Sequence, residues 1–284
     1  MARRPFHDEP VSKIAVWSSR LGLFAFVVAA LSIIIVRSAL LELVPALATF
    51  GAALVFAALA ILLAFAAFIV IWRQGKSGLG RALLGLFLGV VLLAYPAYLG
   101  SRGLRLPAIS DVTTDTANPP RFEAGARLRP ADRVDYPGPA VAALQRKSYP
   151  DLGPLDLDTP VKVAFDAALA LVTKRKWSIT DARAPGPGRR DGAIEAVART
   201  PIMGFRDDIV IRFVPMGQGT RIDMRSASRV GDHDFGANAS RIRSLFEDLD
   251  DVISSAPEPR PSADKKGQQQ KKGPPDKRQP PAKR

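Results

Sequence analysis

The chain has 284 residues, of which 47% are hydrophobic, and it carries a formal net charge of +13 at pH 7. This length accommodates one ordinary domain and a further segment. Cysteine is absent, which excludes disulfides, thiolate nucleophiles and zinc sites with cysteine ligands. The apolar residues gather between positions 21 and 99, whereas the carboxyl-terminal segment is basic, so the average composition describes no single part of the chain.

Three uncharged apolar segments are typical of transmembrane helices, namely residues 21–36, 47–71 and 82–99. About 20 apolar residues cross a bilayer core of roughly 30 Å, and Arg20 can extend the short first segment by reaching the headgroups. No segment contains an internal charge, which argues against transport because ion and proton paths use ionisable residues. Gly85 and Gly89 have the GxxxG spacing, which predicts close helix packing or an oligomer contact; an ordinary glycine-containing membrane helix is the alternative.

Basic residues near these segments predict the orientation of the chain. Seven lie at one side of the three spans and three at the other: Arg3, Arg4, Lys13, Arg20, Arg73, Lys76 and Arg81 against Arg37, Arg102 and Arg105. The positive-inside rule therefore predicts a cytoplasmic leader, residues 1–20, and export of everything after residue 99. In a bacterium this means a multi-pass inner-membrane protein with a periplasmic carboxyl-terminal domain.

Residues 100–158 are rich in proline and aspartate and predict an extended wrap or linker without a core of its own. A folded α+β domain is expected over 159–255. It begins with a helix capped by Thr159, continues through four strands at 177–181, 194–199, 208–214 and 220–230, and ends with a helix at 235–253. The predicted architecture is α-β-β-β-β-α, an antiparallel sheet covered by helices.

Alternation along these strands divides the side chains between two faces of the sheet. The apolar face contains Ile194, Ala196, Ala198, Ile209, Ile211, Phe213, Ile222 and Met224. The opposite face contains Glu195, Val197, Arg199, Val210, Arg212, Val214, Arg221, Asp223 and Arg225. The last helix has apolar residues at three-and-four spacing, so it should cover the apolar face.

Three segments carry a family resemblance: DVTTDTANPPRF at 111–122, GAIEAVARTPIMGFRDDIVIR at 192–212, and TRIDMRSASRVGDHDFGANASRIRSLFEDL at 220–249. Over roughly 140 residues they resemble the bacterial family called domain of unknown function 1499. That family is frequently found behind amino-terminal membrane spans, so the resemblance implies a membrane-anchored domain. It implies no activity, cofactor or site residue.

The stretch RSASRVGDHDFGANASRIR at 225–243 has the densest chemistry in the chain. Asp234-Phe235-Gly236 resembles the metal-binding tripeptide of protein kinases, but the other kinase motifs are missing, which favours coincidence. Ser226 or Ser228 with His233 and an aspartate would be too close in sequence for an ordinary triad. Asp232, His233 and Asp234 are weak metal-site candidates, and no metal or other cofactor is expected.

A structural interpretation explains the same stretch without a reaction. Gly231 ends the strand, and Asp232 or Asp234 accepts hydrogen bonds from the first amides of the final helix. Asp207 and Asp208 follow Gly204-Phe205 and could tie down a turn. The rival hypothesis is a hydrolase or metal-dependent enzyme that uses Asp207, Asp208, His233 and Asp234.

Five arginines are expected on or near one sheet face and the start of the final helix: Arg212, Arg221, Arg225, Arg229 and Arg241. Glu195 and Asp223 are the evident partners, so surplus guanidinium groups would form an anion-binding surface. A solvated, salt-bridged face is the alternative. The functional prediction is a membrane-anchored, non-enzymatic envelope module whose exported domain binds an anionic envelope component or a partner protein.

The carboxyl-terminal segment 256–284 holds nine Lys or Arg against three acidic residues and almost no apolar side chain, so we expect it to be disordered. Its charge suits anionic membrane lipids or acidic envelope polymers, and a purely solubilising tail is the alternative. Nucleic acid would be the partner only if this segment were cytoplasmic, so the predicted orientation argues against it.

Overall fold

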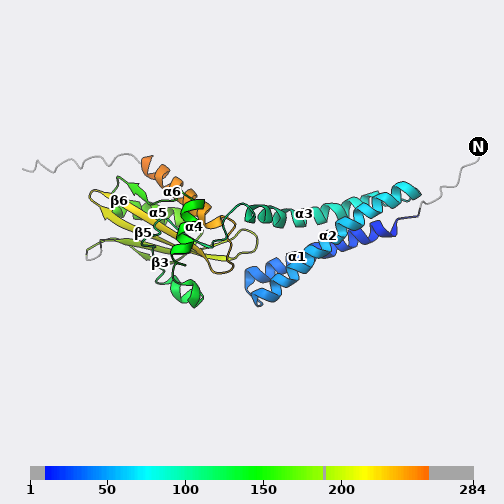
Figure 1. The fold of residues 1–284 in the computed structure, drawn as a ribbon, viewed down its shortest axis with the longest axis horizontal. Helices are drawn as coiled ribbons and strands as arrows, with labels where there is room; N and C mark the ends of the chain where they lie inside the picture. The colour runs from blue at the N-terminus through cyan, green and yellow to red at the C-terminus, as the bar shows by residue number, and fades with distance from the viewer. Residues whose placement is uncertain (1–9, 188–189, 256–284) are drawn as a thin grey trace, which may run out of the picture.

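The computed structural model describes residues 10–187 and 190–255 (Figure 1). Most of the predicted leader, residues 1–9, and the predicted basic tail, 256–284, lie outside the described residues. The chain begins with three long helices, α1 (Lys13–Ser38), α2 (Leu43–Gln74) and α3 (Leu79–Gly103). An α+β domain follows and lies beyond one end of the helices along the long axis of the molecule.

All three helices are long and apolar enough to cross a membrane. Alanine, glycine and serine fill the contacts between them, whereas large apolar residues such as Leu62 and Phe87 point outward. A surface of this kind suits lipid, because membrane helices associate through small residues that let their backbones approach. The three predicted segments are therefore helices of suitable length and composition for membrane insertion.

Gly85 and Gly89 make close contacts with the other two helices. A Cβ at Gly85 would lie 2.6 Å from the backbone carbon of Ser18 in α1. A Cβ at Gly89 would lie 2.8 Å from the carbonyl oxygen of Ala57 in α2. The close approach that this GxxxG spacing permits is therefore used within the chain.

The sheet of the domain contains the four predicted strands and two more. The predicted strands are β3 (Ser178–Arg183), β4 (Gly192–Arg199), β5 (Arg206–Met216) and β6 (Gly219–Ser228). The additional strands are β1 (Asp111–Thr113) and β2 (Leu155–Leu157), which pair with different parts of β6. The strand order is β1-β6-β5-β4-β3, and all pairings are antiparallel.

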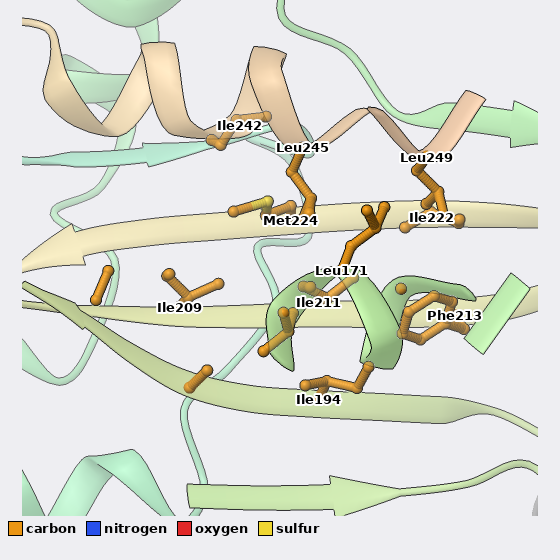
Figure 2. Close-up of a cluster of buried hydrophobic side chains, with 14 of the residues drawn as sticks. Leu171, Ile194, Ile209, Ile211, Phe213, Ile222, Met224, Ile242, Leu245 and Leu249 are labelled. Carbon is orange, nitrogen blue, oxygen red and sulfur yellow. The ribbon is translucent and has the colours of Figure 1, made fainter. Parts of the chain in front are cut away.

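Helices α5 (Val161–Lys174) and α6 (Ala237–Ser254) cover one face of this sheet. Figure 2 shows Ile242, Leu245 and Leu249 of α6 pointing towards Met224 and Ile222 of β6. All eight side chains predicted for the apolar face belong to this core. The two helices start slightly later than expected: α5 follows Pro160 without a side-chain cap from Thr159, and α6 starts at Ala237.

Residues 100–158 form an integral part of the domain, which corrects the expectation of a wrap or linker without a core. They supply β1, β2, the short helix α4 (Pro139–Ser148) and two 3₁₀ turns, Gly125–Leu128 and Ala131–Arg133. Ile109, Val112, Tyr149 and Leu157 enter the main core. Phe122 packs with Val210 and Ala227 on the opposite face of the sheet. The sheet is therefore covered on both faces, since its polar face lies beneath residues 114–138, between β1 and α4, which we call the covering segment.

Candidate functional site

The predicted anion-binding arginines lie where this covering segment meets the sheet, and Arg225 is the most buried of them. Its side chain is only 1% exposed and lies on β6 opposite the residues of β1. Nε and Nη2 donate to the two carboxylate oxygens of Asp111 at 2.9 and 2.7 Å, and two backbone carbonyls accept from the same guanidinium. The rings of Phe122 and Tyr136 lie 4.6 and 5.7 Å from its central carbon. Arg225 is therefore a buried, fully paired group.

Arg229 shares a single carboxylate with a second arginine from the covering segment. It donates to both oxygens of Asp208 at 2.9 and 2.7 Å, while Arg129 donates to the same carboxylate at 2.7 Å. Burial lowers the pKa of the Arg129 guanidinium, and its hydrogen bond with Asp208 acts in the opposite direction. Arg129 also donates to the carbonyls of Ala227 and Ser228, so this pair of arginines clamps the covering segment onto β6.

Arg241, near the start of α6, is paired with the other aspartate of β5. Its Nη2 donates to Asp207 at 2.6 Å, and its Nη1 donates to the Ser226 hydroxyl and to the amide oxygen of Asn238. Asn238 is fully buried and donates in turn to the Ser228 hydroxyl. The two serines of the triad hypothesis therefore belong to a network that joins α6 to the sheet.

Arg212 and Arg221 face Asp223 and a carboxylate from the covering segment. Arg212 Nη2 lies 2.9 Å from Asp223 and 3.1 Å from Asp115. Arg221 lies 3.5 Å from Asp223 and 3.9 Å from Asp115. The chain brings two cations and two anions together here, so this part of the surface has no surplus charge.

Each of the five predicted arginines thus has a carboxylate partner in the described residues. Asp223 is one of these partners, as expected, but Glu195 is not. The remaining partners come from β1, β5 and the covering segment, namely Asp111, Asp115, Asp207 and Asp208. Glu195 instead accepts the backbone amides of residues 123–125 at 2.7–3.2 Å. Asp207 and Asp208 pair with arginines, which differs from the predicted role in a turn.

Asp232, His233 and Asp234 lie between β6 and α6 and point to separate partners. Asp232 pairs with Arg133 at the surface. Asp234 accepts from the amides of Gly236 and Asn238, both at 2.8 Å, and this caps α6 as predicted. Burial raises the pKa of Asp234, against the opposing effect of these two amides. Within residues 10–187 and 190–255, no group of three or more His, Asp or Glu could hold a metal ion.

His233 holds the end of α3 against the domain. Its Nδ1 accepts from the amide of Phe235 at 3.0 Å, so the neutral ring carries its proton on Nε2. Nε2 faces the carbonyl oxygen of Gly103 at 3.3 Å, and the imidazole stacks on the Phe235 ring with centroids 4.5 Å apart. The His233 ring therefore contacts both the end of α3 and the domain.

A cleft of about 530 Å³ lies on the covered side of the sheet, at the start of β4 and the end of β3. We call it the arginine cleft, because four arginines line it together with Glu123 and Asp191: Arg121, Arg183, Arg190 and Arg212. Arg183 forms ion pairs with Asp181, Glu123 and Glu195. Among the described residues, Arg121 and Arg190 form no ion pair and both are exposed.

Of the arginines in this cleft, only Arg212 was selected from the sequence. Arg121 follows two prolines, and Arg190 lies in the connection between β3 and β4, so neither has a place in the strand pattern. Their common location depends on the path of the covering segment over the sheet. The only available signal was the β3–β4 connection, residues 184–191, whose sequence has two arginines against one aspartate.

Comparisons with known proteins identify the domain without assigning an activity. A family model described as "Protein of unknown function (DUF1499)" matches residues 111–249. The chain is also similar to TTHA0849 from Thermus thermophilus, a crystal structure, with 13% identity and a TM-score of 0.21 over 37% of this chain and 97% of that chain. No curated protein matches the sequence. The matched region begins with β1 and ends within α6, and residues 111–249 therefore belong to the DUF1499 family, as the sequence motifs predicted.

Proposed function

We propose that the protein is a membrane-anchored, non-enzymatic binding module whose arginine cleft takes up a carboxylate or phosphate group of an anionic envelope polymer. The observation that carries this proposal is the presence of Arg121 and Arg190, two exposed guanidinium groups beside a cleft of about 530 Å³, without ion-pair partners in the described chain. Guanidinium groups bind planar carboxylates and phosphates through paired hydrogen bonds. A polyanion would thus supply the acceptors that the domain lacks here.

The other two arginines of the cleft are held in place by ion pairs. Arg212 is held by Asp115 and Asp223, and Arg183 is held by Glu195 and two further carboxylates. These ion pairs fix the side chains at the base of the cleft, so a ligand would meet an ordered surface. Preorganised donors lose less conformational entropy on binding than free ones.

The residues of the rival enzyme hypothesis have other roles in the fold. Asp207 and Asp208 accept from arginines, Asp234 accepts from helix amides, and His233 contacts Gly103. A hydrolytic mechanism would have to withdraw these groups from contacts that hold the domain together. The geometry therefore favours a binding module over an enzyme.

The basic residues flanking the helices support a cytoplasmic amino terminus and a periplasmic domain in a bacterial inner membrane. Arg199, at the end of β4, donates to the carbonyl of Arg37 at the end of α1, so this end of the sheet adjoins the helices. The cleft residue Ala193 lies six residues away along β4, which is roughly 20 Å at the strand rise. This separation favours a polymer over headgroups of the same membrane.

The experiment compares Arg121→Gln/Arg190→Gln with Lys147→Gln/Lys174→Gln, an equal change of charge at exposed positions outside the cleft. Each is made in a chain ending at residue 255, so that the basic segment does not contribute. Binding of fluorescent poly-L-glutamate and of inorganic polyphosphate is measured by anisotropy at fixed salt. We expect the cleft variant to bind at least one probe about tenfold more weakly, since charged hydrogen bonds contribute roughly 1.5–3 kcal/mol.

The lysine variant should bind both probes within about twofold of the parent chain. Equal weakening in the two variants would mean that binding depends only on overall charge, and this would overturn the proposal. No measurable binding of either probe by the parent chain would overturn it as well.

A further inference from the structure

A second cavity, of about 370 Å³, lies between the ends of the membrane helices and the domain. We call it the junction cavity. Its walls come from α2, the last turns of α3, the β4–β5 loop and the segment between β6 and α6, and they include Leu47, Tyr98, Met203, Phe205, Val230 and Phe235. Its location and its lining differ from those of the arginine cleft, which contains none of these residues.

Two contacts hold the domain against the helices and keep this space defined. Arg37, at the end of α1, donates to the carbonyls of Pro201 and Ile202 at 2.7 and 2.9 Å, which fixes the β4–β5 loop. On the other side, His233 and Phe235 pack against Gly103 at the end of α3. The cavity therefore has walls anchored to the helices at two separate points.

The cavity reaches the depth at which hydrocarbon begins. Tyr95 and Tyr98 line it and lie eight and five residues before the end of α3, or roughly 12 and 8 Å along a helix. A helix of 25 residues is roughly 37 Å long and exceeds a bilayer core of about 30 Å, so these rings fall near the interface where tyrosine is enriched. An acyl chain can therefore enter the cavity from the bilayer without crossing water.

The size and chemistry of the cavity suit such a chain. A dry apolar cavity of about 150 Å³ binds benzene, so a space more than twice that volume accommodates a longer hydrocarbon segment. Water would gain few hydrogen bonds from the leucine, methionine, valine and phenylalanine side chains of the wall. An apolar occupant removes these surfaces from water, which is favourable in proportion to the area buried.

One cation at the cavity has no carboxylate partner among the described residues. Arg102 lines the cavity, and its Nη1 lies 3.2 Å from the Tyr98 hydroxyl. Asp207 and Asp234 also line the cavity, but Asp207 is paired with Arg241 and Asp234 caps α6. A guanidinium at the membrane surface attracts an anionic headgroup.

We infer that the junction cavity binds the acyl chain of an anionic membrane lipid, with the headgroup beside Arg102. This goes beyond the proposed polymer binding and depends only on insertion of the three helices into a membrane. The lipid would fill the space between anchor and domain, so the domain would contact a bound lipid as well as the bilayer surface.

The test uses the full chain in nanodiscs containing phosphatidylglycerol with a photoreactive diazirine near the end of one acyl chain. After irradiation, mass spectrometry locates the labelled peptides. Label on residues 13–103 reports membrane insertion, and label on residues 200–205 or 228–237 reports occupancy of the cavity. The two readouts separate failure of the membrane anchor from failure of the lipid site, and neither depends on the arginine cleft.

Val230→Trp places a bulky ring at the cavity. Val252→Trp is its matched control, because both valines are 45% exposed and Val252 lies on α6, outside the cavity. We expect Val230→Trp to reduce domain labelling at least fivefold and the control to leave it within twofold. Arg102→Gln should reduce labelling about fivefold, whereas Arg105→Gln, three residues away and outside the cavity, should not. A phosphatidylcholine probe should label the domain less than phosphatidylglycerol.

Absence of label from 200–205 and 228–237 in the parent chain, with the helices labelled, would overturn the inference. The inference would also be overturned if neither Val230→Trp nor Arg102→Gln reduced labelling of the domain, or if the two lipids labelled the domain equally. The parent-chain result does not depend on any variant, so a variant that fails to fold leaves the test decisive.

Discussion

Replacing Arg225 with glutamine tests whether this arginine is a structural group or a binding group. Its guanidinium makes a two-bond pair with Asp111, and the side chains are 1% and 7% exposed. Glutamine cannot replace that pair and leaves the Asp111 carboxylate buried without its counterion. Breaking a buried ion pair in this way costs about 3–5 kcal/mol, a large part of the roughly 5–15 kcal/mol that stabilises a typical domain.

Hydrogen exchange of the full chain in detergent, followed by mass spectrometry of peptides from β5 and β6, measures this loss. Core strands exchange through the least frequent openings, so their slowest amides report the stability of the domain. We expect these amides to exchange more than about a hundredfold faster in Arg225→Gln, as a loss of about 3–5 kcal/mol implies. The control is Arg243→Gln, whose pair with Asp151 has side chains 36% and 54% exposed. Such a surface pair contributes less than about 1 kcal/mol.

A double variant, Arg225→Met with Asp111→Leu, removes both charges and fills their space with apolar atoms. It should regain much of the lost stability, since a buried pair can often be replaced by packed apolar side chains. An Arg225→Gln chain that exchanges no faster than the Arg243→Gln control would refute the structural role. That result would return Arg225 to the exposed surface that the sequence alone suggested.

Two further predictions concern the membrane helices. Gly85→Ala should lower the midpoint of thermal aggregation in detergent, because the added Cβ would meet the backbone of Ser18. The control is Gly80→Ala, whose Cβ would meet nothing within 4 Å and should leave the midpoint unchanged. Equal midpoints for the two variants would contradict the close packing of α1 and α3. The expected loss is about 1–3 kcal/mol, as for other overpacked sites. Alkaline phosphatase fused after residue 255 should be active, and a fluorescent protein that matures only in the cytoplasm should be dark there. The reverse pair of results would invert the proposed orientation and make nucleic acid a candidate partner.

The parts of the fold with a regular pattern could be predicted from the sequence. Strands β4, β5 and β6 alternate apolar residues over several positions, and α6 repeats them at three-and-four spacing, so Ile209, Ile211 and Leu245 were placed in one core. Strands β1 and β2 have three residues each, too few to show a period. Both occur in proline-rich sequence that resembles a linker, and for this reason residues 100–158 were excluded from the core.

The candidate site depended on contacts that no local pattern contains. Arg225 and Asp111 are 114 residues apart, and Arg229 and Asp208 are 21 apart. Alternation placed Arg212, Arg221 and Arg225 on one face correctly but could not show that a further segment covers that face. Capping of α6 by Asp234 was confirmed because a cap requires only residues adjacent to the helix.

The bond between Arg37 and the β4–β5 loop has a mechanical consequence. A domain joined to its membrane helices by a single backbone connection can rotate about that connection and take up many distances from the bilayer. Here the Arg37 contact supplements the backbone connection at Gly103. Two attachment points restrict rotation of the domain to the axis that joins them. With the three helices inserted in a membrane, these two attachments would limit how far the arginine cleft can move towards or away from the lipid surface, and a ligand bound there would be held at a restricted height above the membrane.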